Sequence, residues 1–203
     1  MRWPSRRRTC GWATNAVAFV ALLDACVLYP APLRDLLLRL AQTKVFRARW
    51  SDQIQAEWMN AALRERPELA AALQRTRALM DAAIDDCLVS GHEPLIPTLQ
   101  LPDPFDRHVL AAAIVGRADV IVTSNLRDFP ASVLSPYRIE AQHPDVFVRH
   151  VLDLDEAAAL SAVRDQRAAL RNPPRTVAEF LDTLARQQLP ETVAFLRGRA
   201  GLI

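Results

Sequence analysis

The sequence predicts an α/β domain followed by a smaller helical extension, and three observations support this fold class. The chain has 203 residues, 51% of them hydrophobic and 24% charged, which is ordinary for a globular protein with one substantial core. In the first two thirds, short apolar segments alternate with amphipathic helical patterns. From about residue 154 onwards the pattern is helical throughout. One α/β domain with an appendage therefore fits better than two full domains.

The first predicted strand covers residues 17–23, an apolar run that ends at Asp24. Three consecutive arginines stand before it, at positions 6–8, so this part of the chain imitates a secretory signal. The apolar run is short, however, and Asp24 stands where a cleavage site needs small neutral residues. We expect residues 1–18 to be a disordered or mis-started basic tail. No stretch approaches the roughly 18 apolar residues of a membrane span.

The next segment predicts a helix, a strand and a second helix. Leucines at helical spacing predict the first helix over residues 33–44. Alternating side chains predict a strand over residues 45–50. Ser51 is a good N-cap for a helix that runs to about residue 65, and Glu57 lies on this helix beside its apolar side.

The middle of the chain predicts one long helix and a loop. Apolar residues recur at spacings of three and four over residues 69–89, which predicts a single helix that packs on the core. Gly91 and Pro94 end this pattern. Residues 95–101, with Pro97 inside, are expected to form a loop or an edge strand.

Polar side chains gather around a strand predicted over residues 119–123. Asp103 is a natural cap for a helix that has Asp106 in its first turn, and Asn125 and Asp128 directly follow the strand. Ligand and metal sites of α/β proteins lie at the carboxyl ends of strands. Because Asp24 also follows a strand, we expect these polar groups to meet at one edge of the sheet.

The remainder of the chain predicts one more strand and then helices. An edge strand is expected over residues 135–140 and a turn at 143–145. The extension contains Thr176 with Glu179 three residues later, which is the pattern of a capping box. Its helices are expected at residues 154–171, 176–187 and 191–199. They are too few for a core of their own, so they should dock on the main domain or bind a partner.

Charge and cysteine content limit the possible partners. The net charge of +2 is too small to indicate nucleic-acid binding by itself, so a polyanion would have to be held by local arginines and a metal ion. Cys10, Cys26 and Cys87 lack the spacing of metal ligands and are odd in number. They fit the reducing cytoplasm, where we expect the protein to act.

Four acids could share one site: Asp24, Glu57, Asp106 and Asp128. Carboxylates in one pocket repel each other and raise each other's pKa values unless a cation neutralises them. Oxygen ligands favour Mg²⁺ or Mn²⁺ over Zn²⁺. Such an ion can activate water and stabilise charge on a phosphate, so hydrolysis of a phosphodiester is the chemistry that these acids would serve. His108 is expected on a different helical face from Asp106, as a surface residue or substrate contact at best.

These motifs together resemble the PIN-domain ribonucleases of the VapC toxin type. Leu22-Leu-Asp24-Ala-Cys-Val-Leu28 is similar to the family's first-strand motif, and Glu57 to its helix glutamate. Asp106-Arg-His-Val-Leu-Ala-Ala-Ala113 is similar to its third acidic motif. Val122-Thr-Ser-Asn125-Leu-Arg-Asp128-Phe129 is similar to its closing strand and turn. The resemblance covers roughly residues 19–135, and the order and spacing of the motifs make it specific.

The resemblance implies a three-layer α/β/α fold with a central parallel sheet, a Mg²⁺ or Mn²⁺ site and endonucleolytic cleavage of RNA. It gives Asp24, Glu57 and Asp106 the role of catalytic metal ligands. Many family members have an aspartate two residues after the threonine, where this chain has Asn125, so Asp128 is expected to complete the site. The implied boundaries are a tail at 1–18, a nuclease domain at 19–143 and a helical extension at 144–203.

The resemblance also implies partners. Thr123, Asn125, Arg107 and Arg127 are expected to contact the RNA substrate, with the arginines at its phosphates. Toxins of this type are encoded beside an antitoxin protein that blocks the active site, and homodimers are common in the fold. A cognate antitoxin and a second copy of the chain are therefore expected partners, and a membrane is not.

Two alternatives remain open. A haloacid-dehalogenase-like phosphatase also has an aspartate after its first strand, but it needs a second aspartate two residues later, where this chain has Cys26. A catalytically weak or silent PIN-like protein that binds RNA or protein is the other alternative, because Asn125 stands where an acid is common.

Overall fold

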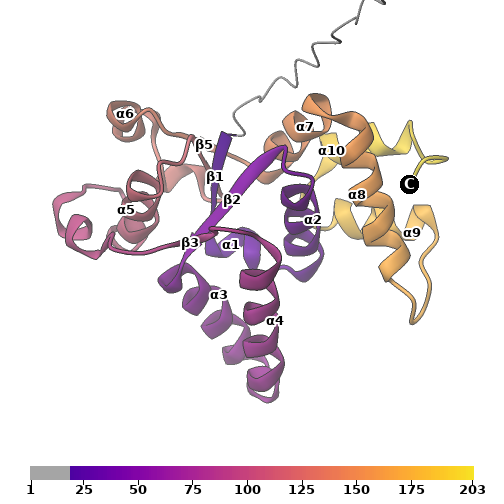
Figure 1. Ribbon diagram of the computed structural model, residues 1–203, viewed down its shortest axis with the longest axis horizontal. Helices are drawn as coiled ribbons and strands as arrows, with labels where there is room; N and C mark the ends of the chain where they lie inside the picture. The colour runs from indigo at the N-terminus through magenta and orange to yellow at the C-terminus, as the bar shows by residue number, and fades with distance from the viewer. Residues whose placement is uncertain (1–18) are drawn as a thin grey trace, which may run out of the picture.

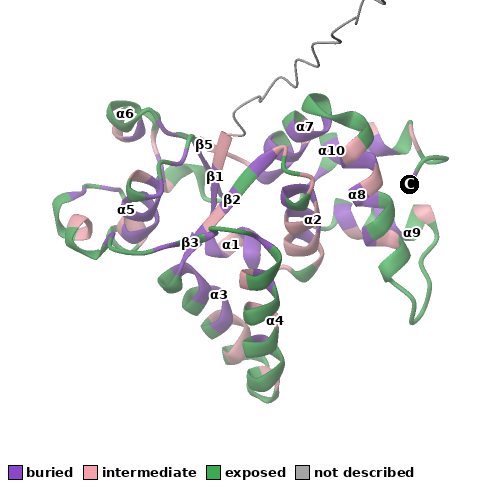
Figure 2. Cartoon of the chain, in the orientation of Figure 1, coloured by how far each residue is buried: buried purple, intermediate pink, exposed green. Residues whose placement is uncertain are grey.

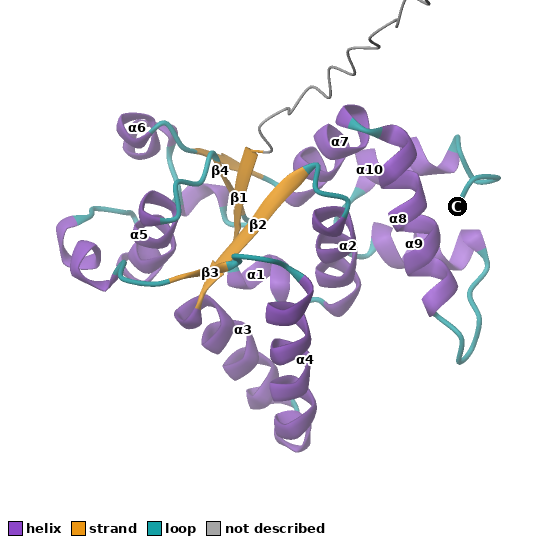
Figure 3. Cartoon of the chain, in the orientation of Figure 1, coloured by secondary structure: helices purple, strands orange, loops and turns teal. Residues whose placement is uncertain are grey.

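A five-stranded parallel sheet forms the centre of the protein. The structure is a computed structural model that describes residues 19–203, so the predicted tail and the first two residues of the first predicted strand lie outside the described residues. The strand order is β3-β2-β1-β4-β5. Figure 3 shows these strands surrounded by helices. Their bounds are β1 (Phe19–Leu23), β2 (Phe46–Ser51), β3 (Leu88–Val89), β4 (Val120–Val122) and β5 (Glu140–Gln142).

Helices cover both faces of this sheet. Figure 1 shows α5 and α6 on one side of the strands and α2 with α7 on the other. This arrangement confirms the expected three-layer α/β/α fold with a parallel sheet. The bounds are α1 (Ala25–Leu28), α2 (Ala31–Gln42), α3 (Asp52–Glu65), α4 (Ala70–Ala83), α5 (Arg107–Val115), α6 (Ala131–Leu134), α7 (Pro144–Leu154), α8 (Glu156–Ala169), α9 (Val177–Ala185) and α10 (Pro190–Arg197).

The core lies between the sheet and these helices, and Figure 2 shows its buried residues in the strands and on the helix faces turned toward them. At the amino ends of β1 and β2, the rings of Phe19, Phe46 and Phe147 pack together, with 4.9 Å between the centroids of Phe46 and Phe147. Phe147 belongs to α7, so this aromatic cluster joins the sheet to the beginning of the helical extension. Among residues 19–203, no helix has the length and apolar character needed to span a bilayer.

The helical extension docks on the main domain, as its length led us to expect. Helix α8 packs along α2, and Gln166 Nε2 donates a hydrogen bond of 2.8 Å to the carbonyl oxygen of Pro32. Within the extension, the buried carboxylate of Asp145 accepts hydrogen bonds from the backbone N–H groups of Glu191 and Thr192, each at 2.8 Å. The predicted capping box of Thr176 and Glu179 is present at the start of α9.

The single helix predicted over residues 69–89 is wrong. Helix α4 ends at Ala83, and the last two residues of the range form strand β3 beside β2. A turn in which Asp86 has φ of 55° separates them, a backbone conformation that a helix cannot continue through. Trp50 N–H in β2 then donates to the carbonyl oxygen of Cys87 at 2.9 Å, so pairing with another strand overrides the helical periodicity.

Three smaller boundaries also differ from the expectation. The expected loop or edge strand at 95–101 begins as a 3-10 helix, Glu93–Thr98. The strand expected at 135–140 is instead a 3-10 turn, Ser135–Tyr137, and the strand begins only at Glu140 because Arg138 has φ of 58°. The turn expected at 143–145 is the start of α7, whose N-cap is His143; Leu154 ends α7 and does not begin the next helix.

Candidate active site

The carboxyl ends of β1 and β4 bring the first acid and the closing motif together. These strands are parallel neighbours, with Leu23 opposite Val122. Asp24 directly follows β1 and Thr123 directly follows β4, and the Asp24 N–H donates to the Val122 carbonyl oxygen at 3.2 Å. Two segments that are about a hundred residues apart in the sequence therefore meet at one edge of the sheet.

Asp24 is fixed by hydrogen bonds on both carboxylate oxygens. The residue is only 4% exposed. Oδ1 accepts from the Ala25 N–H at 2.6 Å, which caps α1. Oδ2 accepts from Thr123 Oγ1 at 2.7 Å and from Cys26 Sγ at 3.1 Å. Burial raises the pKa of Asp24, although the hydrogen bonds from Thr123, Cys26 and Ala25 act in the opposite direction.

Thr123 and Cys26 hold this acid in place. Thr123 is fully buried, and its Oγ1 also accepts a hydrogen bond from the Asn125 N–H at 3.0 Å. Cys26 Sγ accepts from the Ser124 N–H at 3.2 Å. Burial and the neighbouring charge of Asp24 raise the pKa of Cys26 to about 12, so this side chain remains a thiol at neutral pH. This contact of Cys26 was not predicted from the sequence, where its position two residues after Asp24 was the available signal.

The pKa of Asp106 is affected by the other acids of the site. It ends a 3-10 turn, Pro104–Asp106, and directly precedes α5. Burial raises the pKa of Asp106 to about 7, and the charges of four acids contribute further to the rise: Asp24, Asp103, Asp128 and Glu57. The carboxylates predicted from the sequence are thus close enough to act on one another. Asp103 is the predicted helix cap, because its Oδ1 accepts from the Phe105 N–H at 2.8 Å.

Glu57 and His108 form a contact that the sequence analysis did not predict. Ser51 caps α3 through the Ile54 N–H, as predicted, and Glu57 lies in this helix with 51% of its side chain exposed. His108, expected on the surface, is 4% exposed, and its Nε2 lies 3.3 Å from Glu57 Oε2. The expectation failed because Asp106 belongs to a 3-10 turn, so helical spacing does not relate its direction to that of His108.

The other predicted residues lie around these acids with different exposure. Asp128 is half-buried at the end of a 3-10 helix, Leu126–Asp128, and its N–H donates to the Asn125 carbonyl oxygen at 3.0 Å. Asn125 and Arg127 are exposed, and Arg107 is half-buried. Phe105 was missed by the sequence analysis although it directly precedes Asp106; its side chain is 85% exposed. The signal that could have identified Phe105 was an aromatic residue in an otherwise polar turn.

The donor chemistry of this site fits a hard divalent cation. The converging groups are all carboxylates; burial raises the pKa of Asp106 most and the charges of the other acids add to the rise, and a cation would offset both effects. In the part of the chain from 19 to 203, however, no three His, Cys, Asp or Glu side chains stand grouped so that they could hold a metal ion as arranged. The residues are therefore of the type that binds such an ion and lie near one another. Their side chains would have to move to coordinate it.

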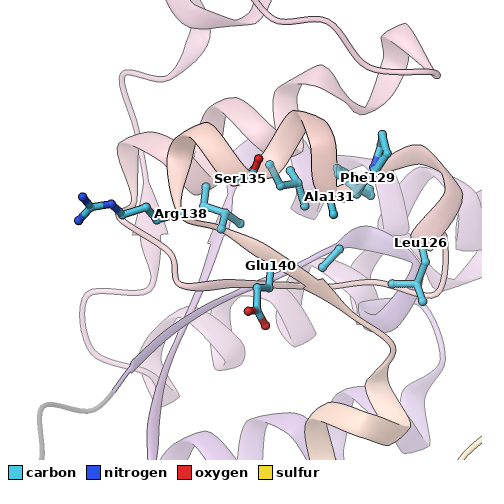
Figure 4. Close-up of a pocket in the computed structure, with 10 residues that line it drawn as sticks. Leu126, Phe129, Ala131, Ser135, Arg138 and Glu140 are labelled. Carbon is cyan, nitrogen blue, oxygen red and sulfur yellow. The ribbon is translucent and has the colours of Figure 1, made fainter.

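A pocket of about 690 Å³ lies beside this edge but does not contain the acids. It is formed by α6, β5 and the segments around them, and Figure 4 shows the Glu140 carboxylate and the Arg138 guanidinium at its margins. Its wall is mostly apolar, made by Leu126, Phe129, Pro130, Ala131, Leu134, Ser135, Arg138, Ile139, Glu140 and Ala141. The predicted catalytic acids are absent from this wall, so the pocket offers no reaction chemistry of its own.

Known proteins match the chain in two segments. The family model described as "PIN domain" matches residues 20–127, and the model described as "VapC50 C-terminal domain" matches residues 144–198. The chain is 47% identical to "Putative ribonuclease VapC50" of Mycobacterium tuberculosis (strain ATCC 25618 / H37Rv) over 92 residues, which are 45% of this chain and 54% of that relative. The chain thus spans about half the length of this curated relative. No solved structure matches the chain.

Proposed function

The chain belongs to the PIN domain family, and on this premise we propose that it is a divalent-cation-dependent endoribonuclease, the toxin of a type II toxin–antitoxin pair. The observation that carries the proposal is the convergence of carboxylates on Asp106 at the carboxyl edge of the sheet. The printed name of the relative, a ribonuclease, supports the same activity.

Asp24, Glu57, Asp106 and Asp128 would hold Mg²⁺ or Mn²⁺. A bound cation would supply positive charge beside the scissile phosphate and lower the pKa of an attacking water. The protein's own contribution is to keep the acids oriented and partly desolvated. Asp24 illustrates this, because Thr123 and Cys26 donate to the same carboxylate oxygen and the Ala25 N–H holds the other. Asn125, where relatives of this type often have an acid, would contact substrate through its exposed amide.

Cleavage of RNA is the direct test. We expect purified protein to cleave a fluorescently labelled single-stranded RNA with Mn²⁺ and to lose activity at least a hundredfold in Asp24→Asn, which removes a charge but keeps the shape of the side chain. Asp182→Asn, an exposed change on α9, is the matched control and should cleave like the wild type. Cleavage that survives Asp24→Asn, or that needs no metal, contradicts the proposal and favours the binding-module alternative.

Phe105 and the arginines beside the acids would bind the substrate. Arg107 and exposed Arg127 can contact phosphates, and the exposed ring of Phe105 offers a face on which an unpaired base can stack. Stacking of one base contributes about 1–3 kcal/mol. We therefore predict that Phe105→Ala weakens RNA binding in Ca²⁺ about fivefold to a hundredfold, measured by fluorescence anisotropy.

Leu79→Ala is the control for this prediction, because Leu79 is also a large exposed apolar residue, 64% exposed, and lies on α4. It should leave RNA affinity unchanged. Equal RNA affinity of Phe105→Ala and the wild type would rule out the stacking role. Loss of antitoxin binding by Phe105→Ala with unchanged RNA affinity would assign the ring to the protein partner instead.

A protein inhibitor is the expected partner. The match of residues 144–198 to the VapC50 C-terminal domain supports membership of the toxin group within the family. A small DNA-binding protein encoded in the neighbouring reading frame, and its copurification with this chain, would support the antitoxin. The free thiols of Cys26 and Cys87 fit action in the reducing cytoplasm.

A further inference from the structure

His108 and Glu57 come from different helices and meet beside Asp106. His108 lies in the first turn of α5, two residues after Asp106, and Glu57 lies in the second turn of α3. His108 Nε2 is 3.3 Å from Glu57 Oε2, a close polar contact that is slightly longer than the usual range of about 2.7–3.2 Å for an N–H···O hydrogen bond. Within the described residues, this is the one polar side-chain contact recorded for the Glu57 carboxylate.

The two partners differ strongly in exposure. The side chain of Glu57 is 51% exposed, whereas that of His108 is 5% exposed and is fixed by an α5 segment whose next five residues are completely buried. An exposed glutamate samples many rotamers, and ordering it costs up to about 2 kcal/mol of side-chain entropy. A contact with a buried ring restricts the rotamers of the glutamate. The geometry therefore favours His108 as the fixed partner, which orients the side chain of Glu57.

Burial of the His108 ring costs free energy, because one of its nitrogens has no hydrogen-bond partner in the described part of the chain. Its Nδ1 is buried and has no hydrogen-bond partner among residues 19–203. Burying an unsatisfied polar atom costs about 1–3 kcal/mol, so an apolar residue would fill this position at lower cost. Nε2, by contrast, faces Glu57. The chain therefore retains a costly buried imidazole at the position from which it reaches one of the acids.

We propose that His108 is a positioning residue that holds the Glu57 carboxylate toward Asp24 and Asp106, so that the three acids can share one cation. The inference rests on the proposed function in one respect, namely that Glu57 is a cation ligand. Outer-shell partners of this kind orient metal-binding carboxylates, and their loss typically weakens metal affinity about tenfold to a hundredfold. His108 acts through Glu57 and has no direct contact with the ion or the RNA.

The test is a double-mutant cycle read by Mn²⁺ affinity, measured by electron paramagnetic resonance on purified full-length protein without RNA. The variants are His108→Met, which fills the space without a donor, His108→Gln, which keeps an N–H donor at similar reach, Glu57→Gln, and the double variant. We expect His108→Met to weaken Mn²⁺ binding about tenfold and His108→Gln to recover most of that loss. In the Glu57→Gln background, His108→Met should change the affinity less than twofold.

His92→Met is the matched control, because His92 is another buried histidine, 2% exposed, whose ring nitrogens have no hydrogen-bond partner in the described chain. It should leave Mn²⁺ affinity unchanged. Thermal midpoints of all variants separate a loss of positioning from a loss of folding, since a purely structural role would make Mn²⁺ affinity follow the midpoint in both histidine variants.

Three results would overturn the inference: equal weakening by His108→Met and His108→Gln, a His108→Met effect that persists in Glu57→Gln, or imidazole nitrogen bound directly to Mn²⁺. The nuclease proposal is judged separately by RNA cleavage. A cycle that behaves as expected in a protein that cleaves no RNA would sink the nuclease proposal alone. Wild-type protein that binds no Mn²⁺ would overturn both.

Discussion

At the scale of single residues, the site is defined by how each acid is held. Asp24 is constrained on both oxygens, whereas Glu57 has one polar side-chain contact among residues 19–203, to His108. Thr123 links Asp24 to the loop after β4, because its hydroxyl donates to Asp24 and accepts from the Asn125 N–H. Because this hydroxyl is fully buried, we propose that Thr123 acts indirectly, by fixing an acid and the loop that follows β4.

The raised pKa of Asp106 leads to a prediction about stability. Its folded-state pKa of about 7 lies above the ordinary value of 3.8, so the folded protein binds a proton more tightly than the unfolded chain does. The free energy of unfolding of the metal-free protein should therefore decrease as pH rises from about 4 to about 8. Asp106→Asn removes this contribution, which is on the order of 1 kcal/mol after solvent screening of a half-buried carboxyl.

Urea unfolding in EDTA at pH 5 and pH 8 measures this effect. We expect the difference between the two pH values to be smaller in Asp106→Asn than in the wild type, with some difference left because the pKa of Asp24 is also raised. Asp182→Asn should keep the wild-type difference. A wild-type protein that becomes more stable at pH 8 would contradict the raised pKa of Asp106 in the folded protein.

At the scale of elements, close packing between α5 and β3 depends on a glycine. Gly116 is the C-cap of α5, and a Cβ placed there would lie 2.8 Å from the Ala112 carbonyl oxygen in the last turn of α5 and 2.9 Å from Val89 Cγ2 in β3. Both distances are too short for ordinary contact, so the end of α5 or the Val89 side chain would have to shift. Since α5 also carries His108 and directly follows Asp106, such a shift would reach the acidic site.

Gly116→Ala should lower the free energy of unfolding by about 1–3 kcal/mol, measured by urea denaturation. Gly201→Ala is the matched control, because a Cβ at Gly201 meets no atom within 4 Å and φ there is not positive. We expect the control to remain within about 0.5 kcal/mol of the wild type. Equal stability of both variants would mean that α5 and β3 tolerate a wider separation.

Helix caps could be predicted from the sequence, whereas two short strands could not. Ser51, Asp103 and Thr176 are local signals, and each makes its expected hydrogen bond. Strand β3 was not readable, because two residues carry too little pattern and only the pairing of the 87–89 segment with β2 makes it a strand. Strand β5 is a similar case: its position follows from the turn at Arg138 and from pairing with β4.

At the scale of the whole molecule, the extension is joined to the PIN domain by buried contacts. Helix α8 lies on α2, and α7 provides both Phe147 for the aromatic cluster and Asp145 for the start of α10. The two family matches, residues 20–127 and 144–198, correspond to segments that pack against each other. Changes in the extension are therefore expected to affect the stability of the whole protein.

Asp145→Ala tests the packing within the extension, where Asp145 of α7 holds the start of α10. The substitution leaves the N–H groups of Glu191 and Thr192 without their acceptor, one of them buried, so we expect a loss of about 2–3 kcal/mol and faster hydrogen exchange in α10. Asp155→Ala removes the exposed cap of α8, which accepts from the Ala158 N–H, and should cost about 1 kcal/mol. A smaller loss for Asp145→Ala than for Asp155→Ala would contradict a stabilising role of Asp145 at the start of α10.

Local periodicity and end signals in the sequence predict the fold class, several helix caps and the order of the acids, and the resemblance of the motifs predicts the family. Which groups meet is seen only in the folded protein: Thr123 and Cys26 at Asp24, His108 at Glu57, and β3 beside β2. Side-chain partners and strand pairing depend on contacts between distant segments, and helical spacing predicts a direction only within one regular helix. His108, two residues from Asp106 across a change from 3-10 turn to α-helix, lies beyond that limit.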